Sequence, residues 1–464
     1  MSESFDVVVV GSRVAGASLA TLLAREGLNV VVVDQTSVDR PVLSSHLIQA
    51  DSLTFLDRLG VIDAVRRLGV PFMCRADTRL EDLHIIADFP QRPGDLGAAA
   101  VIRRHLLDPI LRDAAAEAGV DVRTNTKVVG LVRDGDRVAG VRVASAGSEY
   151  ELHAQLVVGA DGRSSTVAKL CEAREYNITE NARFYYWTFF EGAAPWSDDT
   201  LIFHRWGDQM VWGGPADSGL FLVGVSPEQA GRDEFCKDLT GGLLKYMRTC
   251  EPMARALVDA RIATKVHGVR KFKAYFREPC GPGWVLIGDA GHFKDPAAGR
   301  GIGDAFLQAD AMVPAVVAAL DGSGEPLDQA LARWGEWREH KFTGHYWMAD
   351  GLGGSGTMPT MGVELVRQLH RAGKTDEYLD LFSHRSRYYD VFTLPRLAAA
   401  TTRLLARRAT DRRALFDEAQ VLAFHEGRRR WINKHPDFDS GDPSIADSWA
   451  TPREEPRARS LASV

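Results

Sequence analysis

Residues 5–34 read FDVVVVGSRVAGASLATLLAREGLNVVVVD, and this stretch decides the fold. The valine run up to residue 10 predicts a strand buried on both faces of a parallel sheet, and residues 17–25 have the pattern of a helix. A second valine strand, 30–33, ends on Asp34, which follows Gly11 by 23 residues. This spacing is close to the roughly 20 residues between a dinucleotide-binding loop and its ribose-binding acid, so the stretch predicts a βαβ unit that holds an adenine dinucleotide.

Each position of the turn has a physical task. Gly11 permits the tight turn, and Gly16, after Ala15, lets helix and strand pack closely. The helix N-terminus offers unpaired N–H groups to a pyrophosphate, and Asp34 can accept ribose hydroxyls. Arg13 departs from the fingerprint, because it stands where a second glycine usually allows close approach of the backbone. An α/β turn without a nucleotide is the weaker interpretation, since strand, turn, helix, strand and acid all occur in order.

The composition is that of a globular chain without affinity for polyanions. Its 464 residues are enough for two or three domains, and the net charge of −6 gives no attraction to nucleic acid or anionic lipid. The five cysteines are scattered without a C-x-x-C pair, which predicts free thiols in a reducing compartment. No signal sequence and no continuous apolar stretch of about 18 residues is visible, so we expect a cytoplasmic protein without a membrane span. No cluster has metal-ligand spacing, so no metal site is expected.

Two further glycine-rich loops extend the pattern. Residues 156–164, LVVGADGRS, predict a strand running into a loop with Asp161 and Gly162. Residues 284–292, WVLIGDAGH, predict a strand ending in Gly288 and Asp289, and a glycine-rich segment then opens an apolar helix over 305–320. This second helix N-terminus suits anionic or electron-rich ligand atoms. The alternate glycines before it would let the backbone lie against a flat ligand.

Together these motifs resemble the FAD-dependent monooxygenases of the para-hydroxybenzoate hydroxylase type, a superfamily that also includes flavin halogenases and geranylgeranyl reductases. The shared motifs are GSRVAG at 11–16, ADG at 160–162 and GDAGHFKDPAAGRG at 288–301, with Arg104 opening an amphipathic helix. The resemblance covers roughly residues 5–320. It implies an α/β fold, in which a Rossmann-like FAD-binding domain carries an inserted antiparallel β-sheet substrate domain and a C-terminal helical region.

The resemblance also assigns cofactor contacts, with FAD as the cofactor and NAD(P)H as its reductant. The first loop would hold the pyrophosphate, which Arg13 would cover, while Asp34, Arg104 and the backbone near Val128 would contact the adenosine. The second loop is linked in the family to both FAD and the pyridine nucleotide. Asp289 would bind the ribityl chain, and the segment after it would lie beside the isoalloxazine ring. The residues expected to contact FAD are Gly11, Arg13, Ala15, Gly16, Asp34, Arg104, Val128, Asp161, Gly162, Gly288, Asp289, Pro296, Gly299, Gly301 and Ile302.

The chain divides accordingly. Residues 1–72, 98–170 and 276–325 are predicted to form a discontinuous FAD-binding domain, and 73–97 with 171–275 a substrate-binding sheet. Residues 326–435 are predicted to be helical and 436–464 to be a disordered tail. Aromatic runs in the sheet segments, such as FYYWTFF at 184–190, would form the core or the walls of a dry substrate pocket. The GLGGSG stretch at 351–356 fits the nucleotide pattern, but no strand precedes it, so it is predicted to be a flexible loop.

The resemblance implies a monooxygenase, a hydroxylase or an epoxidase. NAD(P)H would reduce FAD, O₂ would add at C4a, and the hydroperoxide would oxygenate an aromatic or polycyclic small molecule. His46, His292 and Asp295 are the candidates for proton transfer, although a lone histidine is more often structural. A double-bond reductase like the geranylgeranyl reductases is the main alternative, because it shares the FAD motifs. A halogenase is disfavoured because the first lysine is Lys127, and a non-catalytic flavin-binding protein by the motifs on both sides of the flavin. A homodimer and a separate flavin reductase stay open.

Overall fold

The valine strands form the centre of a mainly parallel sheet in the computed structural model. The model describes residues 3–37, 44, 46–194, 197–407, 411–434 and 449–450. In it β1 (Glu3–Val10) pairs in parallel with both β2 (Val30–Val33) and β10 (Ser148–Gly159), and the valines at their centres are almost fully buried. The sheet also contains β7 (Asp121–Arg123), β8 (Lys127–Asp134), β9 (Arg137–Ser145), β19 (Cys280–Gly281) and β20 (Trp284–Leu286).

Helices cover this sheet and make the largest hydrophobic core. Helix α1 (Val14–Arg25) packs against α4 (Arg104–Glu117) and α9 (Gly301–Leu320), and α9 packs in turn against α10 (Leu327–Leu352). Their apolar faces share one core with the valines of β1 and β2. The shorter helices of this half are α2 (Ala50–Arg58), α3 (Ile62–Arg66) and α5 (Thr166–Leu170).

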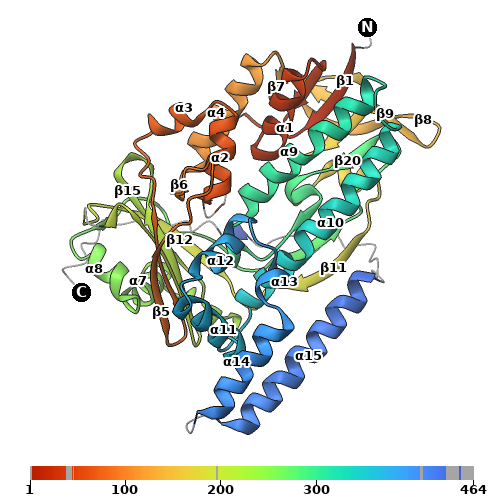
Figure 1. Ribbon diagram of the computed structural model, residues 1–464. Helices are drawn as coiled ribbons and strands as arrows, with labels where there is room; N and C mark the ends of the chain where they lie inside the picture. The colour runs from red at the N-terminus through yellow and green to blue at the C-terminus, as the bar shows by residue number, and fades with distance from the viewer. Residues whose placement is uncertain are drawn as a thin grey trace.

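A second large sheet is mostly antiparallel and lies at the lower left of Figure 1. One of its faces packs against α7 (Leu239–Arg248) and α8 (Glu251–Ala256), and the other against α10 and the C-terminal helices. The short α6 (Arg232–Phe235) precedes α7. The strands of this second sheet are β4 (Arg75–Leu80), β5 (Leu83–Asp88), β12 (Tyr185–Glu191), β13 (Thr200–Trp206), β14 (Gln209–Pro215), β15 (Leu220–Val225), β16 (Arg261–Ile262), β17 (His267–Val269) and β22 (Trp449–Ala450).

Two small sheets connect the large ones. Strand β11 (Glu175–Glu180) falls within the predicted substrate segment, and β18 (Lys273–Arg277) crosses the end of that segment at residue 275. Strand β18 pairs with β11 on one side and with β21 (His292–Phe293) of the third motif on the other. Strand β3 (Leu47–Ile48) pairs with β6 (Ala100–Val101). The division of the chain into an FAD-binding domain, a substrate-binding sheet and a helical region at the residue numbers given above stays a prediction.

The C-terminal region is helical, as the sequence predicts. After α10 come α11 (Thr360–Arg371), α12 (Thr375–Leu379), α13 (Tyr388–Val391), α14 (Leu394–Ala406) and α15 (Arg412–Lys434). Together α11 to α14 form a cap beside the second sheet, and α15 runs along the outside of the molecule (Figure 1). The tail predicted over 436–464 lies outside the described residues, apart from Trp449–Ala450.

One described helix bears on the expectation that the chain has no membrane span. By length and composition α9 could cross a membrane, with a mean hydropathy of 1.3, although Asp304, Gln308 and Asp310 interrupt its apolar residues. It packs between α1 and α10 and half of it is buried within the protein. These contacts are those of the core helix of a globular domain.

Candidate functional site

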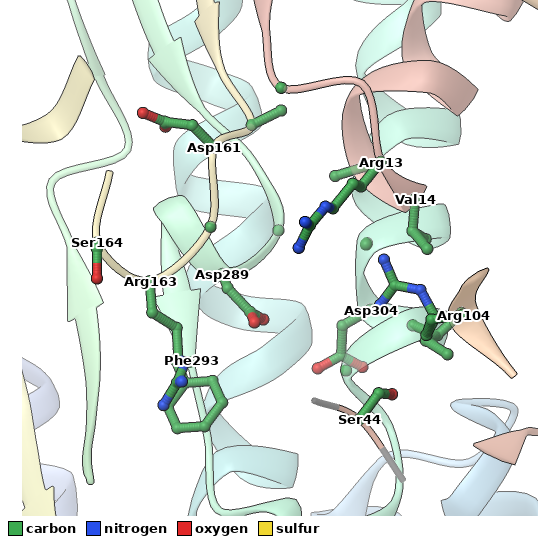
Figure 2. Close-up of a pocket in the computed structure, with 18 of the residues that line it drawn as sticks. Arg13, Val14, Ser44, Arg104, Asp161, Arg163, Ser164, Asp289, Phe293 and Asp304 are labelled. Atoms are coloured by element: carbon green, nitrogen blue, oxygen red, sulfur yellow. The ribbon is translucent and has the colours of Figure 1, made fainter. Parts of the chain in front are cut away.

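The three predicted loops meet in one cavity of about 530 Å³. The strands β1, β10 and β20 are parallel neighbours, so the loops that follow their carboxyl ends open at the same edge of the sheet. All the predicted site residues line this cavity except Gly16 and His46. Figure 2 shows side chains from the three loops and from α4 around the same space.

Close backbone approach explains the first two glycines. Gly11 has φ +108°, and a Cβ there would come within 2.5 Å of the carbonyl oxygen of Ala160. A Cβ on Gly16 would lie 1.9 Å from the oxygen of Gly11. Gly11 therefore brings the first and second motifs together, whereas Gly16 packs α1 against the turn without facing the cavity.

Asp34 lies at one end of the cavity with its carboxylate fully hydrogen-bonded. Oδ2 accepts the N–H and the hydroxyl of Ser12 at 2.8 and 2.9 Å, and Oδ1 accepts the N–H and the hydroxyl of Thr36, both at 2.9 Å. A carboxylate has about four acceptor sites, and all are used. The two hydroxyls can rotate away, so that ribose hydroxyls could take their places while the backbone bonds keep Asp34 oriented.

Two guanidinium groups provide the positive charge of this end. Figure 2 shows Arg13, at the start of α1, and Arg104, at the start of α4, extending into the cavity. Arg104 is held by Asp108 one turn later, with hydrogen bonds of 2.7 and 3.0 Å. Arg13 has no ion-pair partner among the described residues, so it is available to an anionic ligand.

The acidic residue of the second loop, Asp161, stabilises the loop itself. The carboxylate of Asp161 accepts the Ser165 hydroxyl at 2.5 Å and the N–H of Thr166 at 2.6 Å, which fixes the start of α5. Burial raises the pKa of Asp161, against these hydrogen bonds, which lower it. The carboxylate points away from the cavity in Figure 2, so this loop presents backbone and Gly162 to the ligand.

Arg163 of the second loop and Asp289 of the third loop both line the middle of the cavity. Figure 2 shows the Asp289 side chain directed into the space and Arg163 lying against Phe293, with the guanidinium carbon 4.9 Å from the ring centroid. The Tyr275 hydroxyl donates to the Asp289 carbonyl at 2.8 Å and holds this loop in place. Asp289 is therefore placed to accept hydrogen bonds from a polyol chain.

The third motif ends beside a buried carboxyl–phenol pair. Asp295 accepts the N–H of Ala297 at 2.9 Å, and its Oδ1 also accepts the Tyr185 hydroxyl. Burial raises the pKa of Asp295 to about 7, although the hydrogen bond from Tyr185 opposes the shift. The pair lies where the third motif meets β12, so the carboxyl can exchange a proton near neutral pH.

A second, smaller cavity of about 60 Å³ adjoins the first. The two cavities share Leu47, Tyr185, Trp212, Pro296 and Gly299. The other walls are largely apolar and aromatic, and they come from the second sheet and from the C-terminal cap: Gln49, Ala76, Thr78, Phe89, Leu201, Ile202, Phe203, Met210, Ala297, Ala298, Tyr378, Leu379 and Phe382.

A cluster of buried charged and histidine side chains lies against the first cavity, at the end formed by the third motif. Asp304 in α9 is paired with Lys294 at 2.5 Å, with His384 at 2.8 Å and with His292 at 3.4 Å. Burial alone would raise the pKa of Asp304, but Lys294 and His384 hold it well below its usual range. Burial lowers the pKa of His292, so this predicted proton-transfer residue is a neutral partner in the cluster.

His46 does not line either cavity. Its Nδ1 accepts the backbone N–H of Arg104 at 3.1 Å, and its ring lies 5.6 Å from that of Phe189. Burial, followed by the charge of Arg104, lowers its pKa well below the usual value. This geometry supports a neutral histidine that positions α4, and the predicted catalytic contact remains untested.

Several site residues were not singled out from the sequence. Lys294 and Asp304 lie within or just after the third motif, so their proximity to it was a usable signal. Tyr185 belongs to an aromatic run in which no single residue stood out, and Trp212 is the one aromatic residue of the segment 209–215. The cap residues Tyr378 and Phe382 carry no sequence signal, because their role follows from the way the cap folds onto the second sheet.

Comparisons with known proteins agree with this geometry. A family model described as an FAD binding domain matches residues 4–232. The chain is 30% identical over 340 residues to the 6-methylpretetramide 4-monooxygenase of Streptomyces rimosus, which covers 71% of this chain and 79% of that protein. It is 26% identical over 356 residues to the digeranylgeranylglycerophospholipid reductase of Methanosarcina mazei, with 73% and 82% covered. The structure of the flavin-dependent brominase Bmp2 matches with a TM-score of 0.69 at 18% identity, over 87% of this chain and 98% of that one, which shows a shared fold.

Proposed function

This chain belongs to the FAD-dependent superfamily of para-hydroxybenzoate hydroxylase type, and from that premise we propose that it is an NAD(P)H-dependent monooxygenase of aromatic or polycyclic small molecules. Membership makes it an FAD-dependent oxidoreductase. The reductant, the substrate class and the insertion of oxygen are the parts of the proposal that need experiment.

The residues of the first cavity fit FAD. Arg13, which has no ion-pair partner in the described part of the chain, and the N-terminus of α1 suit a pyrophosphate. Asp34 with its two rotatable hydroxyl donors suits a ribose, and Asp289 suits a polyol. At Gly11 the backbone of the first loop comes very close to that of the second loop at Ala160. The cavity therefore has room only for a ligand that extends along the loops. Once bound and reduced, FAD supplies the electrons for the activation of O₂.

The observation that carries the proposal is the second, smaller cavity at the far end of the first one, which we call the substrate chamber. It opens beside Pro296 and Gly299, where the resemblance expects the isoalloxazine ring, and its walls are Tyr185, Trp212 and Phe382 among others. Such walls exclude water and stack against flat apolar rings. An electron-rich aromatic substrate fits these walls better than a polar one.

Tyr185 and Asp295 would handle the proton of such a substrate. A phenolic substrate reacts faster with an electrophilic oxygen when its hydroxyl is deprotonated, and a buried base with a pKa near 7 is suited to accept that proton. Tyr185 lines both cavities and donates to Asp295, so it can pass the proton from the chamber to the carboxylate.

A double-bond reductase is the second candidate, favoured by the 26% identity to the Methanosarcina mazei enzyme over most of both chains. A halogenase has weaker support, because the two lysines that line the first cavity are unsuited to carry an oxidised halogen. Lys127 lies beside Val128, at the predicted adenosine end, and Lys294 is buried against Asp304.

Labelled oxygen separates these candidates. FAD-loaded enzyme is given NADH or NADPH under ¹⁸O₂ with a panel of phenols and polycyclic aromatics, and the products are analysed by mass spectrometry. We expect substrate-stimulated oxygen uptake and one ¹⁸O atom in the product. An unchanged product yield under anaerobic conditions would refute the proposal and favour the reductase. A brominated or chlorinated product in parallel reactions supplied with bromide or chloride would favour the halogenase.

A further inference from the structure

Three metal-ligating side chains converge on the face of the second sheet that is turned away from the substrate chamber. The Nε2 atoms of His84 in β5 and His204 in β13 lie 2.6 and 2.7 Å from the same carboxylate oxygen of Asp77 in β4. The ligand atoms of the three residues all lie within 4.8 Å of one another. Sequence spacing predicted no metal site, because these residues lie on three strands.

The register of the sheet brings the three together. Strand β4 lies between β5 and β13, and His84 and His204 are both paired with Arg79 in the row across the sheet. Asp77 precedes Arg79 by two residues, so its side chain is on the same face. The Arg79 guanidinium lies 4.6 Å from the ring centroid of Trp206 instead of between the imidazoles, which leaves them to the carboxylate.

The carboxylate of Asp77 is buried without a permanent cation. Its side chain is 8% exposed, and among the described residues its ion-pair partners are these two imidazoles. A histidine supplies a positive charge only while its ring is protonated. A buried carboxylate is costly unless a cation compensates it, and a bound metal ion would do so.

We propose that Asp77, His84 and His204 bind one Zn²⁺ ion. Two imidazoles and one carboxylate are a common donor set for this ion, and a water molecule completes the tetrahedron. The His84 side chain is 50% exposed, so an open position faces solvent. Behind the site, the Sγ atom of Cys250 lies 3.5 Å from Nδ1 of His204, where it can orient the ring and leave Nε2 to the ion.

The ion would brace a wall of the substrate chamber without touching the substrate. Neighbours of the ligands on the same strands, Thr78 and Phe203, line the chamber, because successive side chains point to opposite faces of a sheet. The three ligands themselves line neither cavity. Zinc would tie β5, β4 and β13 together, a stabilising role that does not depend on the proposed reaction.

The test measures zinc directly. FAD-loaded enzyme is treated with EDTA, dialysed against ZnCl₂ at known free concentrations, and assayed for bound zinc by elemental analysis. We expect one equivalent in the wild type and at least tenfold weaker binding in His84→Ala. The His84 side chain is half exposed, so its removal leaves the core of the sheet intact. His153→Ala is the matched control, because that histidine is also partly exposed and beside an acid, Glu151, but belongs to no metal-ligating group among the described residues.

Two results would overturn the proposal. One is a wild type that takes up no zinc, in which case the carboxylate is held between two imidazoles alone. The other is equal zinc binding by the wild type and His84→Ala, which would place the ion elsewhere. An anomalous difference peak at the zinc edge, about 2.0–2.2 Å from the two Nε2 atoms, would confirm the location. Zinc should also raise the melting temperature of the wild type but not of His84→Ala, at unchanged flavin content.

Discussion

The substitution Asp295→Asn removes the ionisable carboxyl at the junction of the two cavities while keeping its size. The asparagine oxygen can still accept the hydrogen bonds from Tyr185 and from the backbone of Ala297. The change therefore isolates the effect of charge. Because burial raises the pKa of Asp295 to about 7, the folded protein prefers the neutral form, whereas the unfolded chain ionises near the ordinary 3.8.

The expected magnitude follows from the difference between these two pKa values. A carboxyl with a raised folded pKa contributes its full stability below the unfolded value of 3.8, and loses it progressively as the pH rises from there to the folded value of about 7. Proton linkage gives a penalty in the wild type of about 2 kcal/mol at pH 5 and about 4 kcal/mol at pH 8. Asp295→Asn does not ionise, so its stability advantage over the wild type should grow by about 2 to 3 kcal/mol between these pH values.

Urea unfolding of both proteins, saturated with FAD and followed by circular dichroism at pH 5, 6, 7 and 8, measures this advantage. Tyr185→Phe provides a second arm, because loss of the hydrogen bond that lowers the pKa of Asp295 should move the loss of stability to higher pH. A difference between wild type and Asp295→Asn that is the same at every pH would refute the reasoning. It would mean that the carboxyl is ionised throughout, and that it is no proton acceptor poised near neutrality.

Three other substitutions test separate parts of the site. Gly11→Ala should weaken FAD binding at least tenfold in a fluorescence titration, because its Cβ would lie 2.5 Å from a backbone oxygen; Gly119→Ala, with a positive φ but open space, is the control for backbone strain alone. Asp304→Asn should lower the free energy of unfolding by about 3 to 5 kcal/mol in urea, since it leaves the buried Lys294 ammonium unpaired. Phe382→Ala should raise the KM for an aromatic substrate about tenfold while the Kd for FAD stays unchanged, because this residue lines only the smaller cavity.

The part of the site that could be predicted from the sequence is the part made by local backbone. The turn after β1 needs Gly11 at φ +108°, and the same residues recur wherever a strand must turn sharply into a helix beside a ligand. The other two loops could be assigned to the same ligand because each follows a parallel strand. That β10 lies beside β1 and β20 beside β10 is a fact of the fold, but the assignment required only that the carboxyl ends of the three strands share one edge.

The part that could not be predicted depends on pairs far apart in the chain. Tyr185 and Asp295 are 110 residues apart, and nothing in either segment indicates the other. The position of His46 after the Asp34 strand makes it a candidate, but the direction of its ring follows from α4, whose first N–H it accepts. A residue type near a motif predicts proximity to the ligand, and only packing decides which way the side chain faces.

Packing between residues far apart in the chain also decides the role of the glycines at 351–356, a segment predicted to be a flexible loop. The structure gives the segment a packing role: the carbonyl oxygen of Gly354 accepts Nε of Arg183 at 2.9 Å, and that of Gly356 accepts Nη2 of Arg205 at 2.6 Å. A Cβ on Gly353 would lie 2.4 Å from the Asp295 carboxyl carbon. Gly353, like Gly11 and Gly16, therefore allows a close approach, here to a carboxyl of the protein itself, while the carbonyl groups of Gly354 and Gly356 accept hydrogen bonds from two buried guanidiniums. The resemblance to a nucleotide loop therefore has a physical cause, and only the preceding strand distinguishes the two uses.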